Sequence, residues 1–294
     1  MSGKLKEVRE RIKSVSSTQQ ITKAMKMVSA AKLRQAQNAI TQMRPYANKL
    51  DKMIKNILSN VEGGAGGSYG AERDVQKAAI VVITSQRGLC GAFNSNIGKA
   101  ALARYKELEH LGSNLTFYFV GKKGFDYLKN ITGDAQFNKD FVNLFSDLSF
   151  ENVSEVANHL MQHFVENETD LVHVCYGRFK NAGVQFAESV QFLPVQKLEV
   201  KESDKKSNAD YLFEPSKEEL LDELLPAILQ TTFQKYCLDT QASEHGARMT
   251  AMDKATENAQ ELIRDLKITY NKARQEAITK EILEIVGGAA ALEN

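Results

Sequence analysis

Apolar residues recur at alternating steps of three and four near both ends of the chain. Near the amino end, the recurring positions are Ile40, Met43, Ala47, Leu50, Ile54, Ile57 and Val61. Near the carboxyl end, they are Met249, Met252, Thr256, Ala259, Ile263, Leu266, Tyr270, Ala273 and Ala277. This spacing places each set along one face of a helix, as in coiled coils. Each face needs a partner, and the helix at the other end is the nearest candidate.

The carboxyl-terminal pattern predicts a very long helix. A helix of about 75 residues would be roughly 110 Å long at 1.5 Å per residue, which exceeds the diameter of a domain of this size. We therefore expect the two ends of the chain to form a rod.

The periodicity changes in the middle of the chain. Short apolar runs of strand length occupy Ala78–Thr84, Leu115–Val120 and Leu171–Tyr176. Helical patterns near 94–111 and 152–167 separate them. This alternation predicts a small, mostly parallel sheet flanked by helices. The expected fold class is therefore α/β with a long antiparallel coiled coil.

Composition marks the boundaries between these parts. A glycine-rich segment, Gly63–Gly70, precedes the first strand, and the polar tract Lys201–Asp210 follows the last. The predicted division is an amino-terminal coiled-coil helix (1–62), a central α/β domain (63–210) and a carboxyl-terminal coiled-coil helix (211–294).

Local signals predict where the last helix begins, breaks and ends. Ser216 follows Pro215 directly and has the spacing of a capping box with Glu219. Pro226 lies inside the helical pattern and predicts a break into a short and a long piece. The Gly287–Gly288 pair predicts its end.

Charge is distributed unevenly along the chain, although the net charge is only +1. Residues 1–60 carry 13 basic and 3 acidic side chains, whereas residues 216–294 carry 9 basic and 14 acidic ones. Opposite charges favour pairing of the two end helices. The surplus positive charge is compatible with simple solvation or with an acidic protein partner. Nucleic acid is the least favoured partner, because the lysines alternate with core-type residues.

Few features of the chain predict chemistry. There is no run of about 18 apolar residues and no signal-peptide core at the start, so the sequence predicts neither a membrane span nor export. Gly88–Gly91 and Gly121–Gly124 each follow a predicted strand, but neither completes a phosphate-binding motif. Cys90 beside Arg87 has no histidine near it in sequence to act as a base. The three cysteines are odd in number and far apart, which favours buried free thiols.

One histidine constellation could bind a metal. Glu155, His159 and His163 recur every four residues and would share a helix face. An exposed polar stripe explains the same spacing, and no further ligands are indicated. We therefore expect no metal and no cofactor.

Five segments carry a family resemblance: Ile21–Ala30 (ITKAMKMVSA), Arg44–Tyr46 (RPY), Arg87–Gly91 (RGLCG), Ala242–Met252 (ASEHGARMTAM) and Tyr270–Leu292 (YNKARQEAITKEILEIVGGAAAL). They closely resemble the gamma subunit of rotary F-type ATP synthases. The resemblance implies a non-catalytic rotor shaft that couples proton flow through a membrane ring to ATP synthesis or hydrolysis. Its implied partners are the alpha and beta subunits of the catalytic head, the epsilon subunit and the ring of c subunits. The implied location is peripheral, on the cytoplasmic face of a bacterial membrane.

The same resemblance implies roles for individual residues. Arg274 and Gln275 match a pair that contacts a beta-subunit loop, and Lys23 and Lys26 would face an acidic beta segment. The residues expected to turn in an apolar sleeve belong to the tip of the last helix: Ile282, Ile285, Val286 and Leu292. The residues expected at the foot on the membrane ring are Tyr211 and Glu214, with Phe213 replacing a tyrosine between them.

Two departures and two alternatives accompany this resemblance. Gly246 stands where the family has alanine, which predicts a softer helix there, and Pro226 is likewise unexpected. The first alternative is a coiled-coil tether or scaffold with an α/β cap. The second is a phosphate-handling enzyme built on the middle domain.

Overall fold

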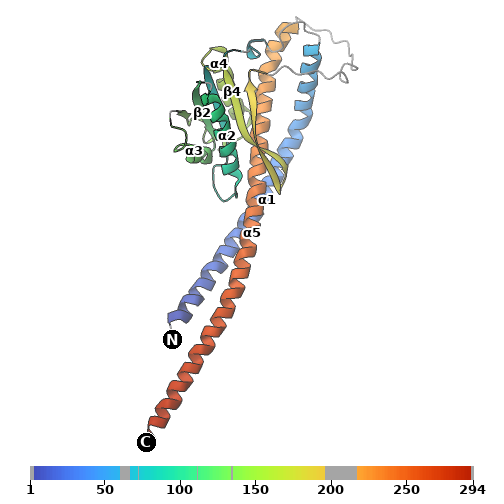
Figure 1. Ribbon diagram of the computed structural model, residues 1–294. Coiled ribbons are helices and arrows are strands. Elements are labelled where there is room, and N and C mark those ends of the chain that lie inside the picture. Colours follow the sequence, from blue (N-terminus) through green and yellow to red (C-terminus); the bar gives the residue numbers. More distant parts are fainter. Residues whose placement is uncertain are drawn as a thin grey trace. The chain divides into compact units, whose positions relative to one another are not determined.

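The computed structural model describes residues 3–59, 67–71, 73–110, 112–133, 135–195 and 217–292. Along the chain, a long helix comes first, an α/β region follows, and a second long helix comes last (Figure 1). The helices are α1 (Gly3–Ser59), α2 (Phe93–His110), α3 (Lys122–Leu128), α4 (Phe150–Val165) and α5 (Lys217–Leu292), with short 3-10 turns η1 (Gly67–Tyr69) and η2 (Leu144–Ser146). The strands are β1 (Lys77–Ile83), β2 (Asn114–Val120), β3 (Gln136–Asn138), β4 (Leu171–Asn181) and β5 (Val184–Leu193).

The chain forms two compact units, and both long helices contribute to each. The coiled-coil unit consists of Met1–Ser29 and Arg248–Asn294, and the α/β unit of Ala30–Ala247. The predicted boundaries at 62, 63, 210 and 211 fall on residues outside the described ranges, so the predicted domain division stays a prediction.

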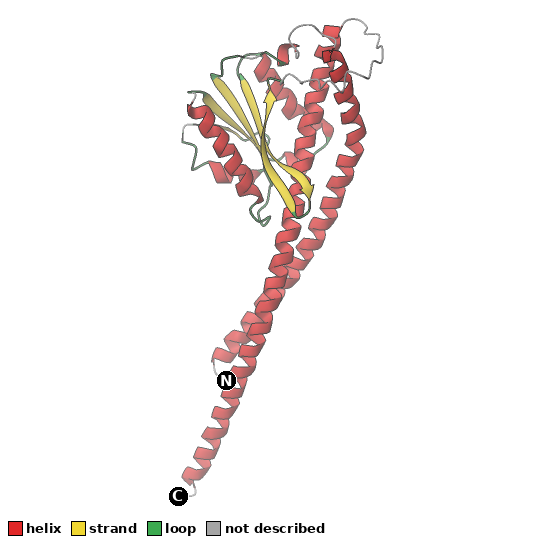
Figure 2. Ribbon diagram, turned by 45° about the vertical axis from the view of Figure 1, so that its right-hand side comes forward, coloured by secondary structure: helices red, strands yellow, loops and turns green. Residues whose placement is uncertain are grey.

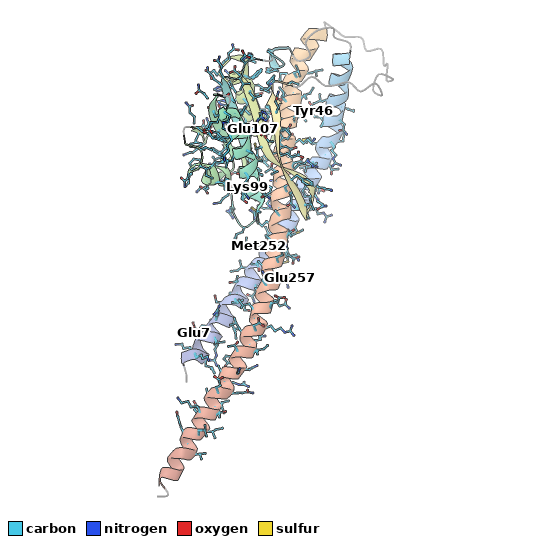
Figure 3. All side chains as sticks on the ribbon, in the orientation of Figure 1. Glu7, Tyr46, Lys99, Glu107, Met252 and Glu257 are labelled. Atoms are coloured by element: carbon cyan, nitrogen blue, oxygen red, sulfur yellow. The ribbon has the colours of Figure 1, made fainter. Side chains whose placement is uncertain are left out.

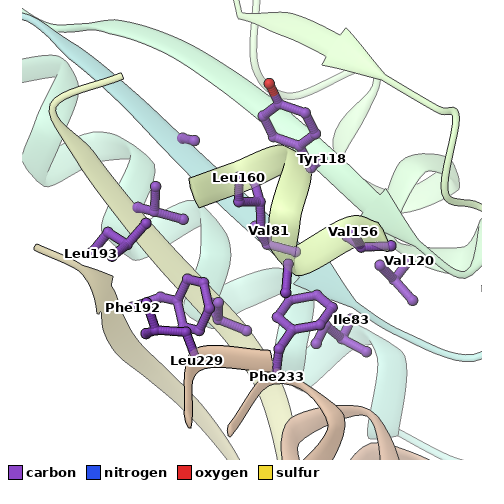
Figure 4. Packing of buried hydrophobic residues seen from close by; sticks show 14 of the residues in the cluster. Val81, Ile83, Tyr118, Val120, Val156, Leu160, Phe192, Leu193, Leu229 and Phe233 are labelled. Carbon is purple, nitrogen blue, oxygen red and sulfur yellow. The ribbon is translucent and has the colours of Figure 1, made fainter. Parts of the chain in front are cut away.

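The sheet of the α/β unit is mostly parallel, as predicted. Its strand order is β3-β2-β1-β4-β5, with β1, β2, β3 and β4 parallel and β5 antiparallel to β4. Helices cover both faces (Figure 2). Residues of α2 and α3 share one hydrophobic core with the sheet, and residues of α4 and α5 share the other. Figure 4 shows the second core, where Phe233 of α5 lies among Ile83, Leu229 and Phe192.

The sequence located the three parallel central strands and the helices α2 and α4, but it missed α3, β3 and β5. Strand β5 interrupts its apolar residues with Gln185, Glu188, Ser189 and Gln191, and only Phe192 and Leu193 are buried. It therefore lacks the continuous apolar run that marked the central strands.

Helix α5 passes through both of its predicted interruptions. It is one helix from Lys217 to Leu292, with Pro226 inside it, so the predicted break is wrong. Pro226 removes one backbone donor, but its neighbours Leu225 and Leu229 are buried at 1% and 5% exposure, which holds the helix across that position. The predicted end at Gly287–Gly288 is also wrong, because neither glycine adopts the left-handed conformation of a helix terminus. The predicted cap, Ser216, lies outside the described residues.

Gly246 has a packing role that the sequence did not reveal. A Cβ atom built there would lie 3.2 Å from both Cα and the carbonyl oxygen of Ala182, and 3.3 Å from Nε2 of Gln185. Ala182 belongs to the turn of the β4–β5 hairpin, and Gln185 lies at the start of β5. Gly246 therefore lets the hairpin approach α5 closely, which gives a reason for glycine besides helix softness.

The coiled-coil unit confirms the predicted carboxyl-terminal pattern. All nine predicted positions from Met249 to Ala277 are buried or half-buried, whereas every other residue between Glu257 and Glu276 is exposed. Figure 3 labels Met252, one of the buried positions, and Glu257, an exposed residue little more than one turn on. Interhelical contacts join Lys26 to Asp253, Thr22 to Thr256 and Arg9 to Tyr270, so the two helices are antiparallel.

The facing positions on α1 alternate by three and four over a longer stretch than predicted. We call them the α1 seam, and within the coiled-coil unit they are Leu5, Val8, Ile12, Val15, Gln19, Thr22, Lys26 and Ser29. In the α/β unit the same alternation continues through Leu33, Ala36, Ile40, Met43, Ala47 and Leu50, all buried or half-buried. The side chains of the predicted Ile54, Ile57 and Val61 lie outside the described residues.

Candidate partner-binding surfaces

Arg274 and Gln275 lie side by side on an exposed part of α5. Both are exposed, and the adjacent Ala273 is buried at 8% exposure. Burial of Ala273 turns the two polar side chains away from the helix pair. A guanidinium and an amide in this position can donate several hydrogen bonds to a partner.

One turn earlier, Tyr270 binds the opposite helix. Nη2 of Arg9 donates a 2.8 Å hydrogen bond to the Tyr270 hydroxyl, and its guanidinium carbon lies 5.7 Å from the ring centroid. The hydrogen bond to Tyr270 raises the pKa of Arg9 above its usual value, and an arginine is cationic in any case.

The two lysines predicted to meet an acidic partner differ in their surroundings. Nζ of Lys26 lies 2.5 Å from Oδ1 of Asp253, and both side chains are partly exposed, at 40% and 44%. An ion pair of this kind contributes about 0 to 1 kcal/mol, so it leaves Lys26 able to change partner. Lys23 is exposed. Lys23 is therefore the more available of the two cations.

Around these lysines, the inward face of α1 is polar and its outward face is apolar, the reverse of the usual pattern in a helix pair. Four successive positions of the α1 seam are polar here: Gln19, Thr22, Lys26 and Ser29. The hydroxyls of Thr22 and Thr256 meet at 2.8 Å.

Large apolar side chains occupy the outward face of the same turns. Ile21, Met27 and Val28 are 59%, 61% and 58% exposed. We call these three residues the α1 outer patch. This patch is not among the surfaces predicted from the sequence, although the apolar positions inside ITKAMKMVSA that are out of step with the seam were an available signal.

The tip of α5 extends past the partner helix. The interhelical contacts imply that Gly3, where α1 begins, lies opposite a residue near 276. Beyond that point α5 exposes large apolar side chains, namely Ile278, Ile282, Leu283, Ile285 and Val286, at 48% to 70% exposure. Exposed apolar residues on one unpaired helix are typical of a surface that a partner covers. The side chain of Leu292 lies outside the described residues, as do Tyr211, Phe213 and Glu214 of the predicted foot.

The two glycine turns of the α/β unit have structural roles. A Cβ atom on Gly121, whose φ is +92°, would lie 2.0 Å from the Thr84 carbonyl oxygen, and the Gly124 amide donates to the Thr84 hydroxyl at 2.8 Å. The thiol of Cys90 is only 1% exposed and accepts a 3.1 Å hydrogen bond from Asn94. Gly121 and Gly124 therefore pack the start of α3 against Thr84, which follows β1, and the Cys90–Asn94 contact holds the Gly88–Gly91 turn at the start of α2.

The histidine constellation is an aromatic cluster. The ring of His159 lies 5.7 Å from that of Tyr118, 5.3 Å from that of Phe141 and 4.2 Å from that of His163. Nδ1 of His163 is 2.5 Å from a Glu168 carboxylate oxygen. Burial, together with the nearby His163, lowers the pKa of His159. Within the described ranges, no three or more His, Cys, Asp or Glu side chains are grouped so that they could hold a metal ion.

All three cysteines are buried and free, as predicted. Burial raises the pKa of Cys175 to about 11 and that of Cys237 still further. Because the thiolate is the reactive form, neither sulfur is suited to nucleophilic chemistry. In the described part of the chain, no helix is both long enough and apolar enough to span a membrane.

Comparisons with known proteins cover almost the whole chain. A family model described as ATP synthase matches residues 4–292. The chain is 51% identical over 297 residues to the ATP synthase gamma chain of Cytophaga hutchinsonii, covering 99% of each. It is 52% identical to the ATP synthase gamma chain of Flavobacterium johnsoniae, covering 98% of each.

Solved structures share the fold. A chain from the mitochondrial ATP synthase of Euglena gracilis, in a structure of its OSCP, F1 and c-ring parts, has a TM-score of 0.67. The match covers 99% of this chain and 95% of that one at 23% sequence identity. A rotor structure of the same enzyme has a TM-score of 0.59 at 23% identity.

Proposed function

Because the chain belongs to the ATP synthase gamma-chain family, we propose that it is the central rotor shaft of an F-type ATP synthase. In this role it couples proton flow through a membrane ring to ATP synthesis, or to hydrolysis in the reverse direction. The observation that carries the proposal is the family match over residues 4–292, which includes both long helices and the sheet between them.

An asymmetric shaft provides a physical means of coupling. Three equivalent catalytic sites around one shaft meet different faces of it at any moment. A ligand or partner that contacts two states of a site unequally shifts the equilibrium between them by that difference. Rotation would therefore change the nucleotide affinity of each site in turn. The shaft needs contacts that differ around its circumference, and it carries no catalytic group of its own.

Three described surfaces supply such contacts in the proposal. Arg274 and Gln275 would bind a beta-subunit loop through charge-assisted hydrogen bonds. Lys23 and the neighbouring α1 outer patch would meet an acidic and partly apolar segment of beta. The exposed apolar tip, including Ile282, Ile285 and Val286, would turn in an apolar sleeve of the head, with Leu292 beyond it.

The other partners are proposed on the family relationship. The alpha and beta subunits would form the head, and Tyr211 and Glu214 would contact the ring of c subunits. The epsilon subunit would bind the same rotor. The chain would then be a peripheral protein on the cytoplasmic face of a bacterial membrane. The proposed division into coiled-coil helices (1–62 and 211–294) and a base domain (63–210) assigns these contacts to the rod and the base.

Affinity purification from membranes, followed by identification of the accompanying chains, tests the proposal. We expect alpha, beta, epsilon and c subunits, with ATPase activity in the complex and none in the isolated chain. Recovery of the chain alone, or with partners that lack nucleotide-binding subunits, would support a tether instead. Micromolar ATP binding by the isolated chain would support an enzyme.

A substitution in the tip tests the rotor role within the assembled complex. We expect Ile282→Ser with Ile285→Ser to leave subunit content intact and to reduce ATP synthesis, because an apolar bearing surface is lost. Ile131→Ser is the matched control, since Ile131 is also exposed, at 48%, but lies in the α/β unit. Equal effects of the tip and control variants would argue against a sleeve around the tip.

A further inference from the structure

The Arg9–Tyr270 hydrogen bond lies close to the end of the helix pair. It joins residues 261 positions apart in the chain. Among the described residues, no other hydrogen bond between α1 and α5 lies nearer to the carboxyl end of α5. Tyr270 is also the last large residue in the buried pattern of α5, because Ala273 and Ala277 follow it.

Packing alone holds this end of α5 weakly against rotation about its own axis. Ala273 and Ala277 bury little surface, and burial contributes roughly 25 cal/mol per Å² of apolar area. On α1, Leu5, at 5% exposure, and the half-buried Val8 supply the large side chains that pack at this end of the pair. A directional hydrogen bond constrains rotation where small side chains do not, since it requires particular donor and acceptor positions.

The direction of Tyr270 determines the directions of the residues that follow it. Successive residues of an α-helix are rotated by about 100°, so Arg274 lies about 40° and Gln275 about 140° around the axis from Tyr270. A change in the rotation of α5 at Tyr270 would turn both side chains by the same angle. Charge-assisted hydrogen bonds of the kind proposed for Arg274 weaken steeply when donor angles are lost.

We propose that Arg9 and Tyr270 are positioning residues, which hold α5 at the rotation that presents Arg274 and Gln275 to their partner. This inference rests on the proposed function. Arginine suits the role, because its planar guanidinium can donate to the hydroxyl and approach the aromatic ring together, which the point charge of lysine does less well. Neither residue need touch the partner.

A double-substitution cycle in the assembled complex tests the inference. Tyr270→Phe keeps the ring in the seam and removes the hydroxyl acceptor, and Arg274→Leu removes the positioned group. We expect Tyr270→Phe to lower ATP synthesis and ATPase turnover several-fold in the wild-type background. In the Arg274→Leu background, it should have little further effect, because the group that it orients is already absent.

A second variant tests the same hydrogen bond from the other side, and a control variant removes a different hydrogen bond of the helix pair. Arg9→Met removes the donor from an exposed position, so it should assemble normally and reproduce the Tyr270→Phe effect, with no additional loss when both are combined. Thr256→Val removes the Thr22–Thr256 hydrogen bond from the same helix pair. Its effect should be the same with and without Arg274→Leu, as expected for a purely structural contact.

The outcomes separate the two proposals. Normal turnover of Tyr270→Phe and Arg9→Met, with Arg274→Leu impaired, would overturn the positioning role and leave the proposed contact of Arg274 intact. Equal losses from Tyr270→Phe in both backgrounds would also overturn it, because the residue would then act independently. Normal turnover of Arg274→Leu would overturn the proposed contact and, with it, the positioning role.

Discussion

The guanidinium of Arg104 on α2 donates a hydrogen bond to Nε2 of His173 on β4, at 2.7 Å. Arginine has no acceptor, so the Nε2 atom of His173 must be unprotonated and the proton of the neutral ring must be on Nδ1. His173 is 6% exposed. Burial in the first place, and the Arg104 charge in the second, lower the pKa of His173 to about 4.

This arrangement predicts a loss of stability in mild acid. A histidine with a folded-state pKa of about 4 and an ordinary value of 6.5 stabilises the fold above pH 6.5 and loses that contribution as the pH falls toward 4. For the chain alone, we expect the free energy of unfolding to fall by about 2 kcal/mol between pH 7.5 and pH 5 from this group. Thermal or urea unfolding at several pH values measures it.

Two glutamine variants assign the effect to its residue. His173→Gln should flatten the pH dependence, and His110→Gln, at an exposed position, should leave it unchanged. If His173→Gln unfolds with the wild-type pH profile, His173 does not stay neutral in the folded chain.

Gly246→Ala should fail to stabilise the chain. Alanine is favoured over glycine inside a helix by about 1 kcal/mol. At Gly246, however, the new methyl group would approach the Ala182 backbone at 3.2 Å, closer than an ordinary contact. We expect the free energy of unfolding to stay unchanged or to fall. The backbone amides of the β4–β5 hairpin should exchange hydrogen faster, because the new methyl group pushes the hairpin away from α5.

Gly288→Ala is the control for Gly246→Ala, because nothing lies within 4 Å of its Cβ position. It should raise the helicity of the α5 tip, as judged by hydrogen exchange. A gain of about 1 kcal/mol from Gly246→Ala would instead show that Gly246 only weakens the helix, as the sequence had suggested.

The α1 outer patch should matter for assembly and not for folding. Ile21→Ser with Val28→Ser removes two exposed side chains, so the isolated chain should unfold at the wild-type midpoint. If a partner buries them, each lost side chain should weaken association roughly tenfold, which corresponds to about 1.4 kcal/mol. Titration of the chain into alpha and beta subunits measures the affinity. The control is Val184→Ser, which also alters an exposed residue and should leave the affinity unchanged. Equal affinities for all variants would argue that the patch stays exposed to solvent in the complex.

Replacing Arg274 and Gln275 together with leucine should uncouple the proposed motor. The buried Ala273 and the half-buried Tyr270 and Ala277 are retained, so folding and assembly should survive. Loss of a charge-assisted contact of about 1.5 to 3 kcal/mol from only some rotary states should unbalance the cycle. We expect both ATP synthesis and ATPase turnover to fall sharply in reconstituted complexes with normal subunit content. Full turnover in such complexes would show that the pair has no role in coupling.

The sequence alone determined the features that depend on local periodicity. The nine positions from Met249 to Ala277 were identifiable because a 3.5-residue apolar repeat leaves one face of a helix to be buried. The central strands were identifiable because a parallel strand is covered on both faces and must be apolar throughout. The same reasoning failed at Pro226 and at Gly287–Gly288, where helix continuity overrode local propensity.

Only the tertiary structure decided which residues meet. Lys26 could have faced solvent or a partner, and its pairing with Asp253 depends on the register of two helices more than 200 residues apart in the chain. The need for glycine at 246 depends on a hairpin that carries little apolar signal of its own. The hydrogen bond from Arg9 to Tyr270 follows from antiparallel pairing. Periodicity specifies the face that a helix buries, whereas the position of its partner along that face is set by the packing of the whole chain.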